Sequence, residues 1–413
     1  MSEEHLVVVG ASLAGARAVQ GARDAGFTGR VTLVGEEPHA PYDRPPLTKA
    51  ALVDDPEPPP AWHLPDAAEC PVDLRLGTRA TGLDPVARVL ATDSGDLPYD
   101  ALVVATGARP RRLGVLDAPG VADHVHVVRT LEDARRLRSA LVPGARVVVV
   151  GAGFVGGEVA SAAVARGASV TVLEAGPTPL ARVLGPPLAA IVVGLHPLHG
   201  VDLRCGTSVV AATAAGAAGA DGPGVVLDLS DGSRLAADVV VVGIGADPAT
   251  DWLAGSGLEV SDGVRCDATL RAAPGVHAAG DVARWTNAWD GAEQRIEQWT
   301  AAGDQGEVAG RNAVLGLRGD AGEECAVVPY FWSVWHGHRI QFAGALHGGV
   351  DEVAVLDGDP WGAPADGWAV VVRSADRVGA VLAVDRPGVL VRQRRHVAAR
   401  AGWDEVLGAR RAG

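Results

Sequence analysis

Lys49 is the only lysine in a chain that otherwise uses arginine for its long cationic side chains. It ends the proline-rich segment from Pro41, which also holds Arg44. Proline fixes φ and disfavours helix at the residue before it, so this segment can keep both cations in a set place. A compact ammonium on a flexible stem can donate hydrogen bonds that a planar guanidinium cannot copy. Lys49 is therefore a candidate functional group, although its uniqueness could also be compositional chance.

A glycine turn follows the first apolar run of the chain. Gly10, Ser12 and Gly15 come directly after Leu6–Val9 and open an alanine-rich helical pattern. Such a strand, turn and helix start offers free N–H groups and a positive dipole end to a pyrophosphate. Glu36 follows Gly15 by 21 residues, where a carboxylate can accept hydrogen bonds from ribose. Ser12 stands where the usual fingerprint has its second glycine.

A second turn of this kind is complete. A valine run is followed by Gly151, Gly153 and Gly156, with Phe154 and Val155 between the last two glycines. Glu174 lies 18 residues after Gly156. Two such units in one chain predict two bound dinucleotides.

Three further apolar runs end in small or acidic residues. They end at Thr106 and Gly107, at Gly243 and Gly245, and at Asp281. We expect the second run to close the second dinucleotide domain. The carboxylate of Asp281 should face a partner, since an unpaired buried charge is costly.

The remaining segments give local predictions. Thr130 and Asp133 should cap a helix, with Arg129 just outside it. Leu74 to Asp100 reads as a small β-meander, Asp54 to Pro60 as an exposed loop, and Ala211 to Gly224 as a loose surface connection. The C-terminal part reads as a meander followed by a helix after Pro387, with strands at Tyr330 to Trp335, Ile340 to Ala343, Val353 to Leu356, Trp368 to Arg373 and Val378 to Val384.

Composition disfavours several classes of protein. The 413 residues suffice for two or three domains, and a formal net charge of −14 with no basic run argues against a nucleic-acid binder. Glu3 and Glu4 stand where a signal peptide would be basic. The apolar stretch from Val147 to Ala165 is interrupted by glycines and Glu158, so we expect a strand and helix there, no membrane span, and a cytoplasmic protein.

The cysteines are too scattered for a redox pair, a zinc site or an iron–sulfur site. They are Cys70, Cys205, Cys266 and Cys325. We therefore expect no metal centre, and a disulfide reductase is disfavoured.

Several motifs together resemble one family. Besides the two glycine turns they are Arg44 to Lys49 (RPPLTK), Ala105 to Pro110 (ATGARP), Arg129 to Ala134 (RTLEDA), His277 to Asp281 (HAAGD), Arg295 to Trp299 (RIEQW) and Pro329 to Ser333 (PYFWS). In this order they resemble the FAD-dependent, NADH-utilising ferredoxin reductases, the putidaredoxin and rubredoxin reductase relatives that serve cytochromes P450 and dioxygenases.

The resemblance implies an α/β fold with two Rossmann-like domains and a C-terminal α/β domain. The FAD domain would comprise 1–110 and 240–319, the inserted NAD domain 111–239, and the C-terminal domain 320–413. The residues implied around FAD are Gly10, Ser12, Ala14, Gly15, Glu36, Arg44, Lys49, Ala80, Thr106, Gly107, Arg129, Asp281, Gln298, Trp299 and Trp332. Lys49 and Glu158 would pair beside the flavin N5, Asp281 would face the ribityl chain, and Trp332 would face the flavin.

The residues implied around NADH are Gly151, Gly153, Phe154, Val155, Gly156, Glu174, Arg182, Gly243 and Gly245. A carboxylate at Glu174 favours NADH over NADPH, and Arg182 could soften that preference. Hydride would pass from the nicotinamide to the flavin, and electrons would leave singly to an iron–sulfur ferredoxin.

The sequence departs from these relatives at Val334-Trp335, where they usually continue Asp-Gln. The resemblance therefore does not define the residues around the flavin or the surface that docks the ferredoxin. Two arginine groups could dock an acidic ferredoxin or could be ordinary solvated faces. They are Arg109, Arg111 and Arg112, and Arg392, Arg394 and Arg395. Two other functions remain, a flavin NADH oxidase and a non-catalytic FAD- and NADH-sensing relative resembling apoptosis-inducing factor.

Overall fold

The computed structural model describes residues 4–54, 71–215 and 224–406 of the chain. Contacts divide the chain into two compact units, each built from separate segments. The described residues of the first unit are 4–43, 71–109 and 247–329, and those of the second are 44–54, 110–215, 224–246 and 330–406. The chain passes between the units along β8 (Ala108–Pro110) and β17 (Ala246–Pro248), which pair with each other.

A six-stranded sheet forms the centre of the first unit, in the order β19-β20-β7-β1-β2-β3. Its strands are β1 (His5–Val9), β2 (Arg30–Val34), β3 (Val72–Arg75), β7 (Ala101–Val104), β19 (Arg271–Ala273) and β20 (Val276–Ala278). The ladders are parallel except between β19 and β20. The strand order reverses beside β1, and ligands of such sheets bind beyond the carboxyl ends of the strands at that point.

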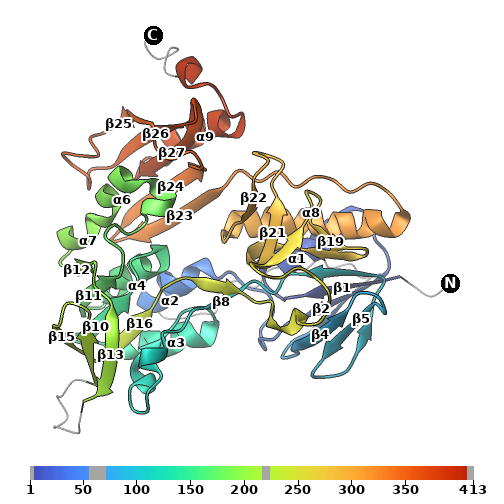
Figure 1. Ribbon diagram of the computed structural model, residues 1–413, viewed down its shortest axis with the longest axis horizontal. Coiled ribbons are helices and arrows are strands. Elements are labelled where there is room, and N and C mark those ends of the chain that lie inside the picture. Colours follow the sequence, from blue (N-terminus) through green and yellow to red (C-terminus); the bar gives the residue numbers. More distant parts are fainter. Residues whose placement is uncertain (1–3, 55–70, 216–223, 407–413) are drawn as a thin grey trace. The chain divides into compact units, whose positions relative to one another are not determined.

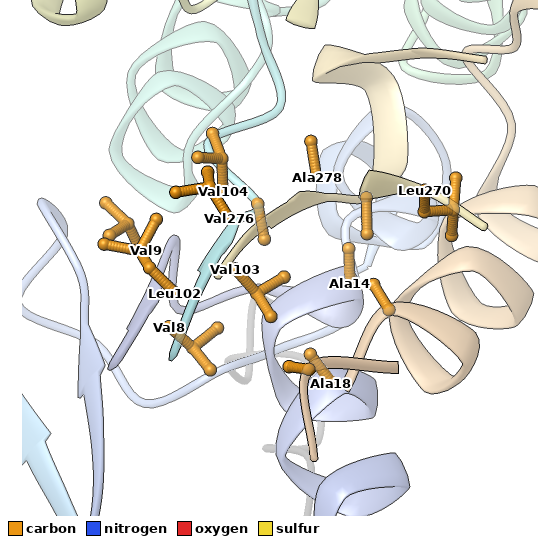
Figure 2. Close-up of a cluster of buried hydrophobic side chains, with 14 of the residues drawn as sticks. Val8, Val9, Ala14, Ala18, Leu102, Val103, Val104, Leu270, Val276 and Ala278 are labelled. Atoms are coloured by element: carbon orange, nitrogen blue, oxygen red, sulfur yellow. The ribbon is translucent and has the colours of Figure 1, made fainter. Parts of the chain in front are cut away.

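Two helices, α1 (Leu13–Asp24) and α8 (Trp299–Arg318), pack closely in this unit (Figure 1). A Cβ on Gly306 would lie 2.3 Å from the carbonyl oxygen of Ala14, and one on Gly310 would lie 1.9 Å from that of Ala18. Glycine is therefore required at both crossings. Ala14 and Ala18 also enter the core against strand residues such as Val103 (Figure 2).

Two small sheets complete the first unit. They are β4 (Ala80–Asp84), β5 (Val89–Thr92) and β6 (Leu97–Pro98), and β18 (Val264–Cys266), β21 (Ala283–Thr286) and β22 (Glu293–Arg295).

The second unit contains a five-stranded parallel sheet in the order β12-β11-β10-β16-β9. Its strands are β9 (Val125–His126), β10 (Arg146–Val150), β11 (Ser169–Glu174), β12 (Asp202–Cys205) and β16 (Val239–Val242). Its helices are α2 (Ala50–Val53), α3 (Leu131–Ala140), α4 (Phe154–Ala165), α5 (Ala181–Leu184), α6 (Pro186–Val193) and α7 (Leu195–Leu198). A small antiparallel sheet holds β13 (Val209–Ala214), β14 (Val225–Leu229) and β15 (Arg234–Ala237).

The second unit also contains the C-terminal sheet, in the order β23-β24-β27-β26-β25. Its strands are β23 (Tyr330–Trp335), β24 (His338–Gly344), β25 (Glu352–Asp357), β26 (Trp368–Ser374) and β27 (Arg377–Val384), and α9 (Pro387–Ala398) follows them. Proline suits the first position of α9 because the N–H that it lacks would have no helical partner there.

Most local predictions are confirmed. Thr130 Oγ1 accepts from the Asp133 N–H at 3.1 Å, and the Asp133 carboxylate accepts from the Thr130 N–H at 3.0 Å. The first meander is confirmed as β4 to β6, although Leu74 belongs to β3 of the large sheet. The five C-terminal strands and the helix after Pro387 are also confirmed.

Two predictions are wrong in part. The C-terminal sheet is not a meander, because β24 pairs with β27 and β25 is an edge strand. The connection predicted from Ala211 to Gly224 begins as β13, which runs to Ala214, because pairing with β14 extends the alanine-rich segment. Residues 216–223, Cys70 and the predicted loop beyond Asp54 lie outside the described residues.

Candidate functional site

The first glycine turn joins β1 to α1. Gly10 has φ +119°, and a Cβ there would lie 2.1 Å from the carbonyl oxygen of Ala105, while a Cβ on Gly15 would lie 2.0 Å from that of Gly10. Ser12 is the N-cap, and the first helical hydrogen bond joins the Ala16 N–H to its carbonyl oxygen at 2.9 Å. The N–H groups of Leu13, Ala14 and Gly15 precede that bond and have no acceptor within the helix, so this helix start can bind phosphate.

Glu36 follows β2 and pairs with Arg79, whose guanidinium lies 2.8 Å from the carboxylate. Both side chains are more than half exposed, so the pair adds at most about 1 kcal/mol to stability. Arg79 directly precedes Ala80, the first residue of β4. No local pattern indicates Arg79 as the partner of Glu36, because it lies 43 residues further along the chain.

A buried amide lies beside the first turn. The Gly280 N–H donates to Gln305 Oε1 at 2.8 Å, and a Cβ on Gly280 would lie 3.0 Å from that of Ala14. Gln305 is fully buried, and its Nε2 has no hydrogen-bond partner. An unpaired buried amide costs about 1–3 kcal/mol, so the position fits a ligand rich in acceptor oxygens, as FAD is. Sequence reasoning missed Gln305 and found only its neighbour Asp281, which is partly buried.

Other predicted FAD residues of the first unit have structural partners. Thr106 Oγ1 donates to the carbonyl oxygen of Ala249 at 2.9 Å, next to Gly107. Trp299 Nε1 donates to Asp43 Oδ1 at 2.9 Å. Gln298, the residue before it, is the N-cap of α8, so the positive end of this helix lies at these two residues.

The second unit brings Lys49 and Glu158 together. Lys49 Nζ donates to Glu158 Oε2 at 2.8 Å and to the carbonyl oxygen of Pro45 at 3.1 Å. Glu158 lies in α4 and is only 6% exposed. Its carboxylate also accepts from Thr48 Oγ1 and, at 2.5 Å, from Ser333 Oγ. The predicted pair therefore exists, and two hydroxyl donors that sequence reasoning missed complete it.

Arg44 and Arg129 also meet in the second unit. Arg44 Nη1 donates to the carbonyl oxygen of Arg129 at 2.5 Å, and the Arg129 N–H donates to Asp133 Oδ2 at 3.2 Å. The capping box of α3 therefore orders the backbone of Arg129, whose carbonyl oxygen accepts the hydrogen bond from Arg44.

Trp332 lies on the opposite face of β23 from Ser333, as strand alternation requires. Its ring stacks near that of Tyr330, with centroids 6.2 Å apart. The guanidinium of Arg394 lies 4.7 Å from the centroid of Tyr330. The predicted aromatic therefore belongs to a small aromatic and cationic group between β23 and α9.

The second glycine turn joins β10 to α4. Gly151 has φ +102°, and a Cβ there would lie 2.4 Å from the carbonyl oxygen of Gly243. A Cβ on Gly156 would lie 2.1 Å from the carbonyl oxygen of Gly151, whereas one on Gly153 would meet nothing within 4 Å. Gly153 therefore faces open space at a helix start, which fits the close approach of a pyrophosphate.

Glu174 ends β11 and folds back on this turn. Its carboxylate accepts from the N–H of Ala152 at 3.0 Å and from that of Gly176 at 2.9 Å. Arg182 is exposed in α5, and Gly245 has φ +101° beside Arg111. The acid predicted to bind ribose therefore also orders the turn.

Histidines cluster near the end of β23. His196 stacks on Trp335 with centroids 4.5 Å apart, and its Nδ1 lies 3.1 Å from His336 Nε2. Burial lowers the pKa of His196 to about 3 and that of His336 to about 4. His196 and His336 are therefore neutral near pH 7.

The described cysteines are free thiols. Burial raises the pKa of Cys266 and of Cys325 to about 12. Partial desolvation, and then the negative charge of Glu174, raise the pKa of Cys205. Within the described ranges no group of His, Cys, Asp and Glu could hold a metal ion. None of the described helices is long and apolar enough to cross a membrane.

Two families match the chain. Pyridine nucleotide-disulphide oxidoreductase matches residues 4–306, and Reductase C-terminal matches residues 330–409.

Individual relatives match almost the whole chain. The ferredoxin reductase component of chlorobenzene dioxygenase from Cupriavidus sp. (strain PS12) is 38% identical over 404 residues, covering 96% of this chain and 93% of that protein. The ferredoxin–NAD(+) reductase component of the anthranilate 1,2-dioxygenase system from Burkholderia cepacia is 38% identical over 369 residues, covering 87% and 86%. The reductase in the covalent putidaredoxin reductase–putidaredoxin complex superposes with a TM-score of 0.86 at 32% identity, covering 96% and 93%.

Proposed function

The chain belongs to the pyridine nucleotide-disulphide oxidoreductase family, and on this premise we propose that it passes electrons from NADH through FAD to an iron–sulfur ferredoxin. The family resemblance and the α/β fold expected from the motifs are confirmed. The observation that carries the function is the presence of two glycine turns of like geometry. The second turn leads into α4, whose buried Glu158 pairs with Lys49. The ferredoxin would serve a ring-hydroxylating dioxygenase or a cytochrome P450.

FAD fits the first unit, where the turn at Gly10 and the orphaned amide of Gln305 offer donors. When bound, FAD would accept two electrons as a hydride and release them one at a time to an iron–sulfur protein. The protein would supply binding, orientation and charge.

Lys49 is proposed as the catalytic cation. An ammonium has three donor hydrogens, and two of them are directed to Glu158 and to the Pro45 carbonyl. The third is left for a ligand. The buried carboxylate restrains the flexible stem, so the ammonium is already positioned when the nucleotides bind.

Glu174 is proposed to select NADH. Its oxygens accept from the N–H groups of Ala152 and Gly176 and still have lone pairs for the ribose 2′-hydroxyl, whereas a 2′-phosphate would be repelled. Arg182 is exposed nearby in sequence and could reduce this preference.

We further propose the three-domain division stated above and a cytoplasmic location. The likeness to the ferredoxin–NAD(+) reductase component of a dioxygenase system supports this location. Fractionation of the native cells with an antibody would test it.

The docking surface for the ferredoxin is proposed at one of the two arginine groups. Arg111, Arg112, Arg392 and Arg395 are exposed, while Arg109 pairs with Asp251 at 3.1 Å. A rate of ferredoxin reduction that falls with ionic strength would support charge-guided docking, and separate charge removal at Arg111/Arg112 and at Arg392/Arg395 would identify the group.

The deciding experiment supplies purified holoprotein and NADH with a panel of [2Fe–2S], [3Fe–4S] and rubredoxin acceptors under anaerobic conditions. Reduction of at least one acceptor is expected. Flavin reduction with no transfer to any acceptor would favour the sensing alternative, and rapid NADH consumption only in the presence of dioxygen would favour the oxidase.

A further inference from the structure

One face of β23 contacts the start of α4 at every second residue. The ring of Phe331 lies 4.3 Å from that of Phe154, measured between centroids. Ser333 Oγ donates to Glu158 Oε1 at 2.5 Å, and Trp335 Nε1 donates to the Phe154 carbonyl oxygen at 3.3 Å. The C-terminal sheet therefore supports the first turns of the helix that follows the second glycine turn.

Gly157 makes this close contact possible. A Cβ there would lie 2.2 Å from Cε2 of Trp335, so the indole occupies the space that any side chain would need. Trp335 and Ser333 are both fully buried. Because packing restricts both side chains, the Ser333 hydroxyl lies within hydrogen-bonding distance of Glu158 in its packed conformation.

The two carboxylate oxygens of Glu158 accept hydrogen bonds from different donors. Lys49 and Thr48 donate to Oε2, and Ser333 donates to Oε1. Only Ser333 comes from the C-terminal sheet, 175 residues away in sequence. Without the Ser333 hydroxyl, the carboxylate could rotate about the last side-chain bond of Glu158, whose torsion has no sharp minima. The Lys49 ammonium, which donates to this carboxylate, would then change its position.

We propose that Ser333 is a positioning residue, which fixes the orientation of the Glu158 carboxylate and through it the place of the Lys49 ammonium. The C-terminal domain thereby takes part in the hydride-transfer site. The effect on electron transfer rests on the proposed function, whereas the positional link between Ser333 and Lys49 does not.

The single lysine of the chain makes the positional link measurable. Protein labelled with ¹³C or ¹⁵N in lysine gives one side-chain resonance, that of Lys49. In Ser333→Ala we expect this resonance to shift and broaden, both in the holoprotein and in protein freed of nucleotide. Thr48→Val should also move it, while Thr48→Ser, which keeps a hydroxyl, should preserve it.

The kinetic test uses the same proteins. The limiting rate of flavin reduction by NADH should fall about tenfold in Ser333→Ala, the effect of about 1.4 kcal/mol, with little change in the NADH concentration at half-saturation. Ser333→Thr should restore most of the rate. Ser374→Ala is the matched control, because Ser374 is a buried serine of the same sheet whose ladder partner is Arg377.

A Lys49 resonance in Ser333→Ala that superposes on that of the unsubstituted protein would overturn the proposal, as would an equal change in Ser374→Ala. Should Ser333→Ala fail to fold, Ser333→Thr and the Thr48 variants still report on the carboxylate. Failure of the proposed function would look different, since NADH would then leave the flavin of the unsubstituted protein oxidised while the resonance comparison remained valid.

Discussion

The two glycine turns share their geometry at both ends and differ in the middle. In each turn the first glycine has φ above +100°. A Cβ on the last glycine would lie about 2 Å from the carbonyl oxygen of the first, so neither position can carry a side chain. The middle position is Ser12 in the first turn and Gly153, which faces open space, in the second. The ends are needed to make the turn, whereas the middle adapts it to its ligand.

The acids that follow the two turns differ as well. Glu36 pairs with an exposed arginine, whereas Glu174 folds back onto the turn that precedes it. The helices also have different supports, because α1 packs on α8 of the large core and α4 packs on β23. We therefore propose that the first turn holds its nucleotide permanently, and that the second binds one that exchanges and is recognised at its 2′ position.

The largest effect is expected from Gly15→Ala compared with Gly156→Ala. Both add a Cβ within about 2.1 Å of a carbonyl oxygen. Gly15→Ala should yield protein without flavin, and Gly156→Ala should keep flavin but lose NADH binding, as measured by absorbance and by titration with NADH. Gly153→Ala is the control, with a normal melting temperature because its Cβ meets no protein atom. Equal flavin loss in all three variants would remove the distinction between the turns.

Lys49→Ala should separate chemistry from binding. Its Nζ is held by two partners, so its removal should slow flavin reduction by about 100-fold while the FAD content stays near that of the unsubstituted protein. Rapid mixing with NADH measures the first quantity and absorbance the second. Lys49→Arg should be slow as well, because a guanidinium cannot occupy the same place. An unchanged rate in Lys49→Ala would contradict the catalytic role.

Glu174→Gln should lower the preference for NADH over NADPH by about tenfold, because the amide removes the charge that repels a 2′-phosphate. The amide oxygen can still accept from the Ala152 N–H, so the turn should survive. Glu36→Gln makes the same change after the first turn and should leave the ratio unaltered. Steady-state rates with both nucleotides provide the measurement, and equal shifts in both variants would refute the assignment.

The smallest effect concerns pH and buried histidines. Burial lowers the pKa of His277 in the first unit and of His126 in the second to about 4 each, and that of His196 to about 3. The unfolded chain binds these protons near pH 6.5 and the folded chain does not, so the unfolding free energy falls as pH decreases from about 6.5 to 4. Above that range these groups have no effect.

His196→Phe and His277→Phe should each reduce this slope, by at most about 1.4 kcal/mol per pH unit. Urea unfolding of holoprotein at several pH values compares the two units. A slope that neither substitution changes would show that other groups dominate acid sensitivity.

Local sequence predicted the elements but not their distant partners. The turns at Gly10 and Gly151 and the cap at Thr130 depend on neighbouring residues, so their patterns are readable from sequence. Lys49 and Glu158 could be paired only by resemblance to a family. Nothing local indicates that Ser333 completes the pair, since this contact requires the register of β23 against α4.

The same limit applies to sheet order and to buried amides. The periodicity of each C-terminal strand is visible, but the pairing of β24 with β27 depends on which strands bury the most apolar area together. Gln305 was missed because a glutamine within a helical pattern is normally exposed, and its burial follows from the glycine contacts of α8 with α1.

The most direct test of electron transfer from NADH to a ferredoxin mixes yellow holoprotein anaerobically with NADH and then with an oxidised [2Fe–2S] ferredoxin. We predict that NADH bleaches the flavin absorbance and that the colour returns as the ferredoxin becomes reduced, with NADPH acting more slowly. A protein that is isolated without flavin and does not acquire it, or a flavin that NADH does not bleach, would contradict electron transfer from NADH through FAD.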